Sequence, residues 1–328
     1  MKYSIIVPCL NEEKSIEELL LSLIKQDHIE IIGEVIISDG MSSDRTRDII
    51  NSYIDIFSDL NIKLIIVDNI NKTTPAGLNK AVEASSFSRI IRLDAHSKID
   101  SDYISEIDAG FDRTNSDLVG PSIKYYNKQS FGAAVCAVIN SKFGNGGTES
   151  RNGLERTGVK HAVMSCYDKG VWVDLGGYDE NLKSNEDFDF DYRAYLKGYR
   201  ISSLSRPIYY ALARDSPLAF ARQRFRYGYW KYKVVKKHPK SLQIRQFVPI
   251  LYTSFFIMAI PVPFLLSILV IPILMVGCIL KLQNKGVKIL DILAALMINY
   301  HCWSLGFMWS ALEEVKMLGK NSIKRGKI

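Results

Sequence analysis

Residues 247–280 constrain the fold more than any other part of the chain, because this 34-residue run contains no Asp, Glu, Lys or Arg. One membrane-spanning helix needs about 20 apolar residues, so the run is too long for one straight span and short for two full ones. Pro261 and Pro263 lie near its middle, and proline interrupts helices. We therefore predict a tight membrane hairpin, or a re-entrant pair, broken near 261–263. A buried helix of a soluble core is the alternative, which the length and lack of charge disfavour.

A second apolar stretch follows at about 289–312. It is less uniformly apolar than the first, since it contains Asp291, Asn299 and His301. We predict that it either spans the membrane or lies as a helix in the interface. The two stretches together define a predicted membrane region at 247–312.

Basic residues gather on both sides of this region. Between 214 and 245 there are ten Lys or Arg residues and a single acid, Asp215, which predicts a basic amphipathic juxtamembrane segment at 214–246. A basic tail closes the chain at 313–328. Such clusters mark the cytoplasmic side of a span and attract anionic lipid. Nucleic-acid binding is the alternative, but a position beside a span favours lipid, so we expect no nucleic-acid partner.

Residues 1–246 have the composition of an ordinary globular protein. In the whole chain 47% of residues are hydrophobic and 23% charged, which excludes a disordered chain. The five cysteines include no CxxC pair, so neither a disulfide framework nor a zinc knuckle is indicated. The chain opens on a short strand-like run and not on an apolar signal segment, and we expect this part to stay in the cytosol.

Apolar runs and helical periodicities alternate along this part of the chain. Strands are predicted at 3–8, 34–38, 63–67 and 89–93, and helices at 12–25, from Ser43 or Asp44 to about 57, and at 74–84. Strands so continuously apolar are covered on both faces, which predicts an α/β fold with a mostly parallel, Rossmann-like sheet between helices. Ligands bind at the carboxyl ends of such strands. The phosphate-cradling patterns GxxxxGK[ST] and GxGxxG are absent, which disfavours an NTPase or a classical dehydrogenase.

Six motifs occur in order: SIIVPCLNEE from Ser4, VIISDG from Val35, TPAGLN from Thr74, RLDAH from Arg92, GGYDE through SNEDFDFDYR from Gly176, and QRFRY from Gln223. Their order and spacing resemble inverting glycosyltransferase family 2, which has a GT-A fold, and especially its membrane-anchored exopolysaccharide enzymes of the succinoglycan glucosyltransferase type. The resemblance covers residues 3 to about 230. It implies a GT-A domain at 1–230, with a nucleotide-binding half at 1–97 and an acceptor half at 98–213.

The resemblance implies a set of donor-binding residues: Pro8, Glu12, Asp39, Asn79, Asp94 and Arg226. In the family Glu12 and Asp39 would hold the nucleoside, and Asp94 would begin an Asp-x-Asp motif that binds Mg²⁺ or Mn²⁺ across the donor phosphates. His96 replaces the second carboxylate, and imidazole suits Mn²⁺ better than Mg²⁺. Without the resemblance, Glu12 would belong to a helix start and Asp39 would be a turn aspartate. Asn79 would be a solvated helix residue and His96 a solvated loop residue.

The fifth motif implies the catalytic group. Asp187, preceded by Glu186, would be the general base that deprotonates the acceptor hydroxyl. A helix N-terminus keeps such carboxylates ionised. The alternative is a pair of capping acids followed by solvated Asp189 and Asp191. The resemblance also implies a set of acceptor-binding residues: Gly177, Tyr178, Gln223, Tyr227 and Trp230.

Two residues keep a second interpretation. Arg226 would pair with the leaving diphosphate, although its helix also reads as a basic membrane-surface helix. Trp172 reads as a core aromatic residue or as a platform for a sugar.

We therefore predict an enzyme of the bacterial inner membrane with its catalytic domain in the cytoplasm. It would transfer a hexose from a nucleotide-linked donor, expected to be UDP, to a hydroxyl of a glycan carried on undecaprenyl diphosphate, beside other polysaccharide assembly proteins. A polyprenyl-phosphate glycosyltransferase, a processive synthase and a catalytically silent membrane scaffold are the alternatives. A polyprenyl-phosphate acceptor is already an anion and needs no strong base, which the Glu186–Asp187 pair argues against.

Overall fold

The computed structural model describes residues 2–148, 151 and 153–325, which form two compact units. The first comprises Met1–Tyr125 and Thr148–Leu212, and the second Tyr126–Gly147 and Ala213–Ile328. The predicted GT-A domain of 1–230 therefore differs from the observed division. Residues 126–147, and the helix that carries Arg226, group with the C-terminal helices instead.

The first unit is built on one sheet, whose strand order is β3-β2-β1-β4-β8-β6-β9-β5, with β7 paired to β9. The strands are β1 Tyr3–Cys9, β2 Ile32–Asp39, β3 Lys63–Asp68, β4 Arg89–Arg92, β5 Ser97–Ile99, β6 Leu118–Tyr126, β7 Arg156–Thr157, β8 Cys166–Asp168 and β9 Ile201–Leu212. The first four strands are parallel, and β8 runs antiparallel to both β4 and β6. The predicted α/β fold with a sheet between helices is confirmed. The sheet is mixed and not mostly parallel, because β5, β7 and β8 pair antiparallel with their neighbours.

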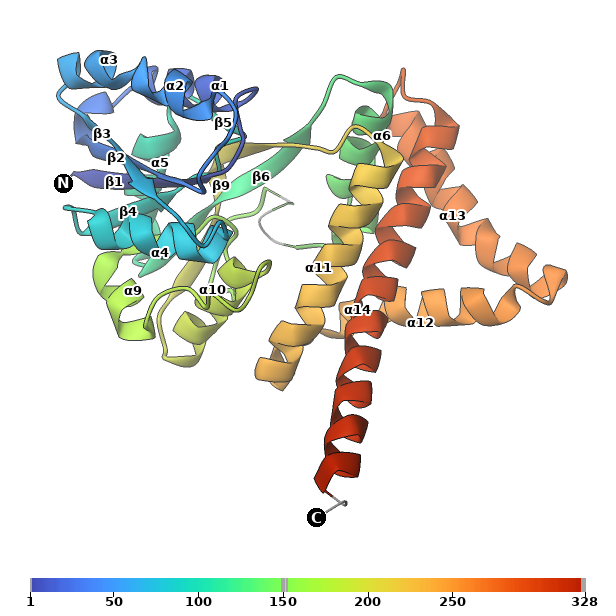
Figure 1. The fold of residues 1–328 in the computed structure, drawn as a ribbon. Helices are drawn as coiled ribbons and strands as arrows, with labels where there is room; N and C mark the ends of the chain where they lie inside the picture. The colour runs from blue at the N-terminus through green and yellow to red at the C-terminus, as the bar shows by residue number, and fades with distance from the viewer. Residues whose placement is uncertain (1, 149–150, 152, 326–328) are drawn as a thin grey trace. The chain divides into compact units, whose positions relative to one another are not determined.

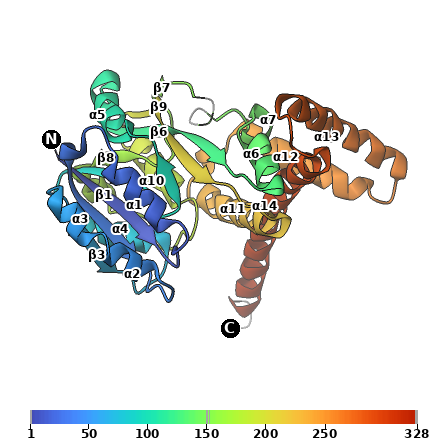
Figure 2. The ribbon, with the colours of Figure 1, turned by 90° about the horizontal axis from the view of Figure 1, so that it is seen from above.

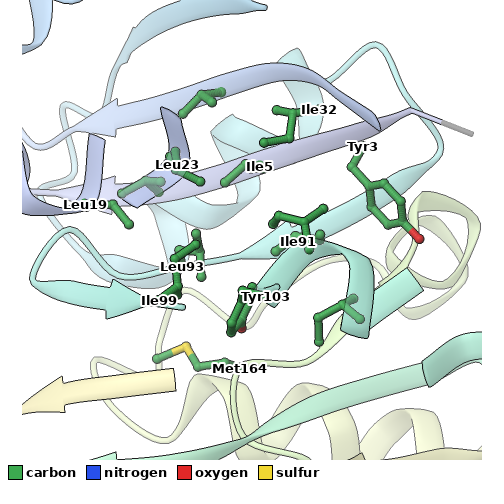
Figure 3. Close-up of a cluster of buried hydrophobic side chains, with 14 of the residues drawn as sticks. Tyr3, Ile5, Leu19, Leu23, Ile32, Ile91, Leu93, Ile99, Tyr103 and Met164 are labelled. Atoms are coloured by element: carbon green, nitrogen blue, oxygen red, sulfur yellow. The ribbon is translucent and has the colours of Figure 1, made fainter. Parts of the chain in front are cut away.

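Helices cover both faces of this sheet (Figures 1 and 2). One face carries α1 Ile16–Ile24, α2 Thr46–Asn51, α3 Ile54–Asp59 and α5 Tyr103–Thr114, and the other carries α4 Thr74–Ala84, α9 Lys169–Leu175 and α10 Glu186–Leu196. Because side chains alternate along a strand, Ile5 packs under α1 whereas Ile6 packs under α4. Figure 3 shows Leu19 and Leu23 of α1 in the same buried cluster as Ile5 and Ile91.

The expected single helix from residue 43 or 44 to 57 is wrong. The chain forms two short helices, α2 and α3, separated at Ser52 and Tyr53. The residue before α2 is Arg45, and it makes no side-chain cap. Asp44 lies outside the helix because its carboxylate accepts hydrogen bonds from Thr46 and from the backbone N–H of Glu13, which fastens this loop to the end of β1.

The second unit is helical. It contains α6 Ser130–Ile139, α7 Lys142–Asn145, α11 Pro217–Lys237, the 3₁₀ turn Pro239–Ser241, α12 Ile244–Ala259, α13 Pro263–Gln283 and α14 Ile289–Arg325. Helix α14 packs against α6, α11, α12 and α13, and Figure 1 shows α11 and α14 side by side.

Two glycines allow the backbones of α11 and α14 to approach closely. A Cβ atom on Gly228 would lie 1.8 Å from the carbonyl oxygen of Trp303, and one on Gly306 would lie 2.0 Å from that of Phe225. Small residues at a helix crossing permit this contact, as in membrane helix pairs. The crossing accounts for the grouping of α11 with the C-terminal helices.

The apolar C-terminal region forms helices of unequal length. The run 247–280 is divided between α12 and α13, which break between Ala259 and Pro263. In α14, Ile289–Met317 covers 29 residues and contains an 18-residue window with a mean hydropathy of 1.3. Within the described residues this is the one helix long and apolar enough to cross a membrane. It continues through the basic segment to Arg325, beyond the end expected near 312. Large apolar side chains are exposed on α12 and α13, among them Phe247, Phe255, Met258, Leu274 and Met275.

Candidate active site

The ends of β1 and β2 carry two loops that are fastened together. The backbone N–H of Asn11 donates to Ser42 Oγ at 2.8 Å, and the Ser43 N–H donates to Asn11 Oδ1 at 2.9 Å. The N–H of Glu12 donates to Thr46 Oγ1 at 2.8 Å. Asn11 adopts a positive φ of 54°, which turns the chain sharply after the strand. The loop that carries Glu12 is thereby held against the loop that follows Asp39.

Asp39 ends β2 and is fully buried. Its carboxylate accepts hydrogen bonds from the backbone N–H and the hydroxyl of Ser42, at 3.0 and 2.5 Å, and lies 3.3 Å from Arg47 Nε. Helix α4 begins close by, since a Cβ atom on Gly77 would lie 3.2 Å from Ser38 Oγ and 3.5 Å from Pro8 Cβ. Pro8 and Asp39 therefore lie at the same edge of the sheet, which is the edge where such folds bind ligands.

Asp94, His96 and Glu12 belong to this edge as well. Asp94 follows β4, and His96 Nδ1 lies 3.1 Å from Glu12 Oε1. All three side chains are partly exposed. Within the described residues, no group of three or more His, Cys, Asp or Glu side chains is placed to hold a metal ion. Asp94 and His96 therefore fit a metal only if other oxygen atoms, such as those of a diphosphate, complete its coordination.

Helix α10 begins at the residues predicted to carry the catalytic base. Asn185 precedes it with a φ of 62°, and the backbone N–H of Phe188 donates to Asp187 Oδ1 at 2.7 Å. Glu186 is buried, and its Oε1 lies 2.9 Å from Nη2 of the buried Arg92. The same nitrogen lies 3.6 Å from Asp94 Oδ1. The structure thus brings the predicted metal ligand Asp94 and the predicted Glu186–Asp187 pair around one cation.

The two neighbouring acids have opposite pKa shifts. Burial raises the pKa of Glu186, and the adjacent charge of Asp187 raises it further, although Arg92 acts in the other direction. Burial also acts to raise the pKa of Asp187, but the electrostatic effects of His161 and Arg92, together with the Phe188 N–H, more than offset it and lower the pKa. Asp187 is thus the member of the pair that stays ionised, as a general base must.

The comparisons with known proteins agree with this arrangement. Residues 4–169 match the family described as glycosyl transferase family 2, and residues 89–311 match glycosyl transferase family group 2. The chain belongs to glycosyltransferase family 2. It is a glycosyltransferase, as predicted.

Three curated relatives place the chain within the family. The succinoglycan biosynthesis protein ExoA of Rhizobium meliloti is 31% identical over 250 residues, which are 75% of this chain and 74% of that protein. The poly(ribitol-phosphate) β-N-acetylglucosaminyltransferase TarS of Staphylococcus aureus is 30% identical over 217 residues, 66% of this chain but only 36% of TarS. A dolichyl N-acetyl-α-D-glucosaminyl phosphate 3-β-D-2,3-diacetamido-2,3-dideoxy-β-D-glucuronosyltransferase of Methanococcus voltae is 25% identical over 240 residues, 71% of this chain and 74% of that enzyme.

A solved structure shares the fold. The crystal structure of S. aureus TarS residues 1–349 in complex with UDP has a TM-score of 0.50 and 21% sequence identity to this chain. The matched region covers 94% of this chain and 92% of the TarS chain. The GT-A fold predicted for this family 2 chain is confirmed.

Asp189 and Asp191 of this family 2 chain are not solvated, so the alternative reading of the α10 acids is wrong for them. Asp189 is buried and lies 2.8 Å from Nε of Arg193, which donates to the carbonyl oxygens of Leu175 and Gly177 at 2.7 Å each. These contacts fasten α10 to the Gly-Gly turn before it.

Asp191 holds α10 on its other side. Its buried carboxylate lies 2.8 Å from His161 Nδ1 and accepts hydrogen bonds from the Ala162 N–H at 2.9 Å and from Ser165 Oγ at 2.7 Å. The loop 158–165 is therefore fastened to the helix that carries Asp187.

Asn79 and Tyr178 lie inside the protein. The amide of Asn79 donates to the carbonyl oxygen of Tyr178 and to Glu180 Oε1, each at 3.0 Å, and accepts from the Tyr178 N–H at 2.8 Å and from Trp172 Nε1 at 3.1 Å. The ring of Tyr178 stacks on Phe190 in the core. Asn79 is thus neither solvated nor on the surface, and Tyr178 supports the loop 176–180 from within the core. The predicted contact of Tyr178 with an acceptor stays a prediction. Trp172 is partly buried against the same core, in line with the core reading.

Gly177 is held to glycine by its surroundings. It has a φ of +75°, and a Cβ atom there would lie 2.8 Å from Asn79 Oδ1 and 3.2 Å from Trp172 Nε1. A side chain would therefore be strained and would also displace the hydrogen bonds of Asn79. Gly177 shapes the loop, and its predicted contact with an acceptor stays a prediction.

The remaining predicted residues lie on α11 in the second unit. Gln223 Nε2 lies 3.4 Å from the Tyr227 hydroxyl, the guanidinium of Arg226 lies 5.9 Å from the Tyr227 ring centroid, and Trp230 packs edge-on against Tyr229. The side chains of Gln223, Arg226 and Tyr227 thus lie together on adjacent turns of α11. Its action on donor or acceptor stays a prediction.

Two residues near Asp187, the predicted base, could not be assigned from the sequence. Arg92 belongs to the RLDAH motif, and the signal available was an arginine that ends a short strand with two apolar residues in its middle. His161, whose ring lies 5.2 Å from that of Phe188, is a single histidine in a loop, and no spacing in the sequence relates it to Asp187 or Asp191.

Proposed function

We propose that the chain is an inverting hexosyltransferase of polysaccharide biosynthesis. It transfers a hexose from a UDP-linked donor to a hydroxyl of a lipid-linked glycan, at the cytoplasmic face of a bacterial inner membrane. The observation that carries this proposal is the position of Asp187 in the first turn of α10, beside the buried Arg92–Glu186 ion pair whose Arg92 also lies 3.6 Å from Asp94.

Asp187 acts as the general base. Its carboxylate accepts the proton of the acceptor hydroxyl while that oxygen attacks the anomeric carbon, and the bond to the nucleoside diphosphate breaks on the opposite side. One displacement inverts the configuration at that carbon. The low pKa of Asp187 keeps the base ionised before the acceptor arrives.

Asp94 and His96 would hold a divalent metal ion together with oxygen atoms of the donor. When bound, the ion would supply positive charge to the departing diphosphate. The contact of His96 with Glu12, at 3.1 Å, orients the imidazole at the same edge. Because imidazole is a poor ligand for Mg²⁺, this pair favours Mn²⁺.

The relatives and the C-terminal helices support the choice of substrates. TarS has been crystallised with UDP and is named for N-acetylglucosamine transfer, ExoA is named for succinoglycan biosynthesis, and the M. voltae enzyme is named for a dolichyl-phosphate-linked sugar acceptor. An acceptor on a polyprenyl lipid lies at a membrane surface. The apolar α14 and the exposed apolar side chains of α12 and α13 would keep the enzyme at that surface.

The experiment that tests the proposal measures nucleoside diphosphate release by detergent-solubilised protein with Mn²⁺ and a panel of UDP-, GDP- and dTDP-sugars. We expect slow hydrolysis of one UDP-hexose, abolished in Asp94→Ala. A matched control is Asp68→Ala, because Asp68 is an exposed acid that ends β3, a strand that β1 and β2 separate from β4. Hydrolysis that favours a GDP- or dTDP-sugar would contradict the proposed donor. Failure of the wild type both to hydrolyse and to bind every nucleotide would favour a silent scaffold.

A further inference from the structure

Arg92 is a buried cation that takes no direct part in the transfer step described above. It is the last residue of β4 and is 4% exposed. Side chains alternate along a strand, and Ile90, two residues earlier, packs in the core beneath α4 and α10. Arg92 therefore points to the face of the sheet that α10 covers.

One nitrogen of Arg92 serves two carboxylates. Nη2 lies 2.9 Å from Glu186 Oε1 and 3.6 Å from Asp94 Oδ1. Asp94 follows β4 at the donor edge, and Glu186 directly precedes Asp187 in the first turn of α10. A single side chain thus connects the strand end of the donor site with the helix end that carries the base.

Stability alone does not account for this arginine. Its Nε and Nη1 atoms are shielded from solvent and have no hydrogen-bond partner. A buried charge is costly unless it is fully paired, and well-packed apolar residues in place of a buried ion pair are often neutral or stabilising. The incompletely paired cation lies between two carboxylates of the proposed reaction, and a functional role explains its position there.

We propose that Arg92 is a positioning residue for glycosyl transfer, which sets the place of Asp187 relative to the donor by holding Glu186 and Asp94 around one guanidinium. The inference rests on the proposed function, because it takes Asp187 as the base. Arg92 acts through other residues and touches neither substrate nor the reacting atoms.

The proposed transfer requires the base and the donor to be held at a fixed distance from each other. An in-line displacement requires the attacking oxygen to be within about 3–3.5 Å of the carbon and aligned with the leaving group, and a displacement of about 1 Å can cost roughly 10²-fold in rate. The donor edge and the base lie on separate elements, β4 and α10, so something must hold their separation. The positive charge of Arg92 also helps to keep Asp187 ionised.

The test compares Arg92→Met and Arg92→Lys with a control on the same strand, Arg89→Met. The Arg89 guanidinium lies 4.1 Å from the Phe111 ring centroid, so the control also removes a cation from β4. UDP release from UDP-glucose or UDP-N-acetylglucosamine, whichever the wild type hydrolyses, gives kcat, donor KM and the pH profile. UDP affinity is measured by calorimetry.

We expect Arg92→Met to lower kcat by about 10²-fold, with the donor KM changed by less than about threefold. The acid limb of the kcat profile should move to higher pH, because loss of the cation raises the pKa of Asp187. Arg92→Lys should recover part of the rate, since it keeps the charge but not the planar geometry. Arg89→Met should behave as the wild type.

Two further variants keep the inference falsifiable if Arg92→Met fails to fold. Glu186→Gln should slow turnover by a similar factor, and Arg92→Lys combined with Glu186→Gln should be no slower than the worse single variant, because both act through one contact. Multiplied effects in the double variant, or a loss of UDP affinity equal to that of Asp94→Ala, would overturn the positioning role.

The assay separates this inference from the proposed function. Full activity in Asp187→Asn, or a wild type that neither hydrolyses any sugar donor nor binds any nucleotide, would overturn the proposed function and the inference with it. An inactive Asp187→Asn beside a fully active Arg92→Met would overturn the inference alone.

Discussion

Replacing Asn79 with alanine tests whether this residue binds the donor or holds the acceptor-region loop. The side chain makes four hydrogen bonds, to the backbone N–H and carbonyl of Tyr178, to Trp172 and to Glu180. Glu180 is exposed and can turn to water, but the two backbone groups of Tyr178 are buried. Each buried group left without a partner costs roughly 1–3 kcal/mol. We therefore expect Asn79→Ala to lose about 3 kcal/mol of the free energy of unfolding.

The matched control is Asn71→Ala. Asn71 is exposed and also donates to Glu180, at 3.3 Å, so its loss should change stability by no more than about 0.5 kcal/mol. For a unit of this size about 3 kcal/mol corresponds to a fall in Tm of roughly 6–12 °C, which thermal unfolding followed by circular dichroism would resolve. UDP affinity, measured by calorimetry below the transition, should be the same in both variants.

The reverse result would refute this reasoning. If Asn79→Ala melted at the same temperature as Asn71→Ala but bound UDP about tenfold more weakly, a loss of about 1.4 kcal/mol of binding free energy, then Asn79 would be a donor ligand. Its hydrogen bonds to the loop would then contribute nothing measurable.

Three further outcomes follow from the geometry. Gly228→Ala should lower the free energy of unfolding of the helical unit by about 1–3 kcal/mol in denaturant, because its Cβ atom would lie 1.8 Å from the Trp303 carbonyl oxygen. A gain in stability, from the higher helix propensity of alanine, would contradict the close crossing of α11 and α14. His161→Gln should move the acid limb of kcat to higher pH, because the electrostatic effect of His161 lowers the pKa of Asp187. An acid limb that does not move would show that His161 does not influence this pKa. His96→Asp should shift the metal dependence of donor hydrolysis from Mn²⁺ toward Mg²⁺, and activity that survives EDTA in both proteins would exclude a metal at this pair.

Local sequence signals were sufficient to predict most of the strands and helices of the nucleotide-binding half. The predicted strand starts at Tyr3, Lys63 and Arg89 and the helix Thr74–Ala84 agree with the structure, because apolar runs and a proline in the first turn report local preferences. The interruption of the helix at Ser52 was not predictable. Helical periodicity continues across it, and no glycine or proline marks the break.

Long-range pairing explains what the sequence could not reveal about the site. Asp189 and Asp191 look like solvated acids in a polar stretch, and their partners, Arg193 and His161, identify them as buried only once the chain is folded. The central position of Arg92 depends likewise on Glu186, 94 residues away in the chain. The grouping of α11 with α14 also needs a distant pair, Gly228 and Gly306.

The central claim is that Asp187 is the base of an inverting transfer, and one measurement tests it most directly. Wild type and Asp187→Asn are incubated with a radiolabelled UDP-hexose and lipid extracted from bacterial membranes, and label in the lipid fraction is followed over time, with UDP affinity measured in parallel. We predict that Asp187→Asn binds UDP as the wild type does but transfers at least about 10²-fold more slowly, and that the wild-type product has the inverted anomeric configuration. Transfer by Asp187→Asn at the wild-type rate would contradict the account and would favour an acceptor that needs no base, such as a polyprenyl phosphate.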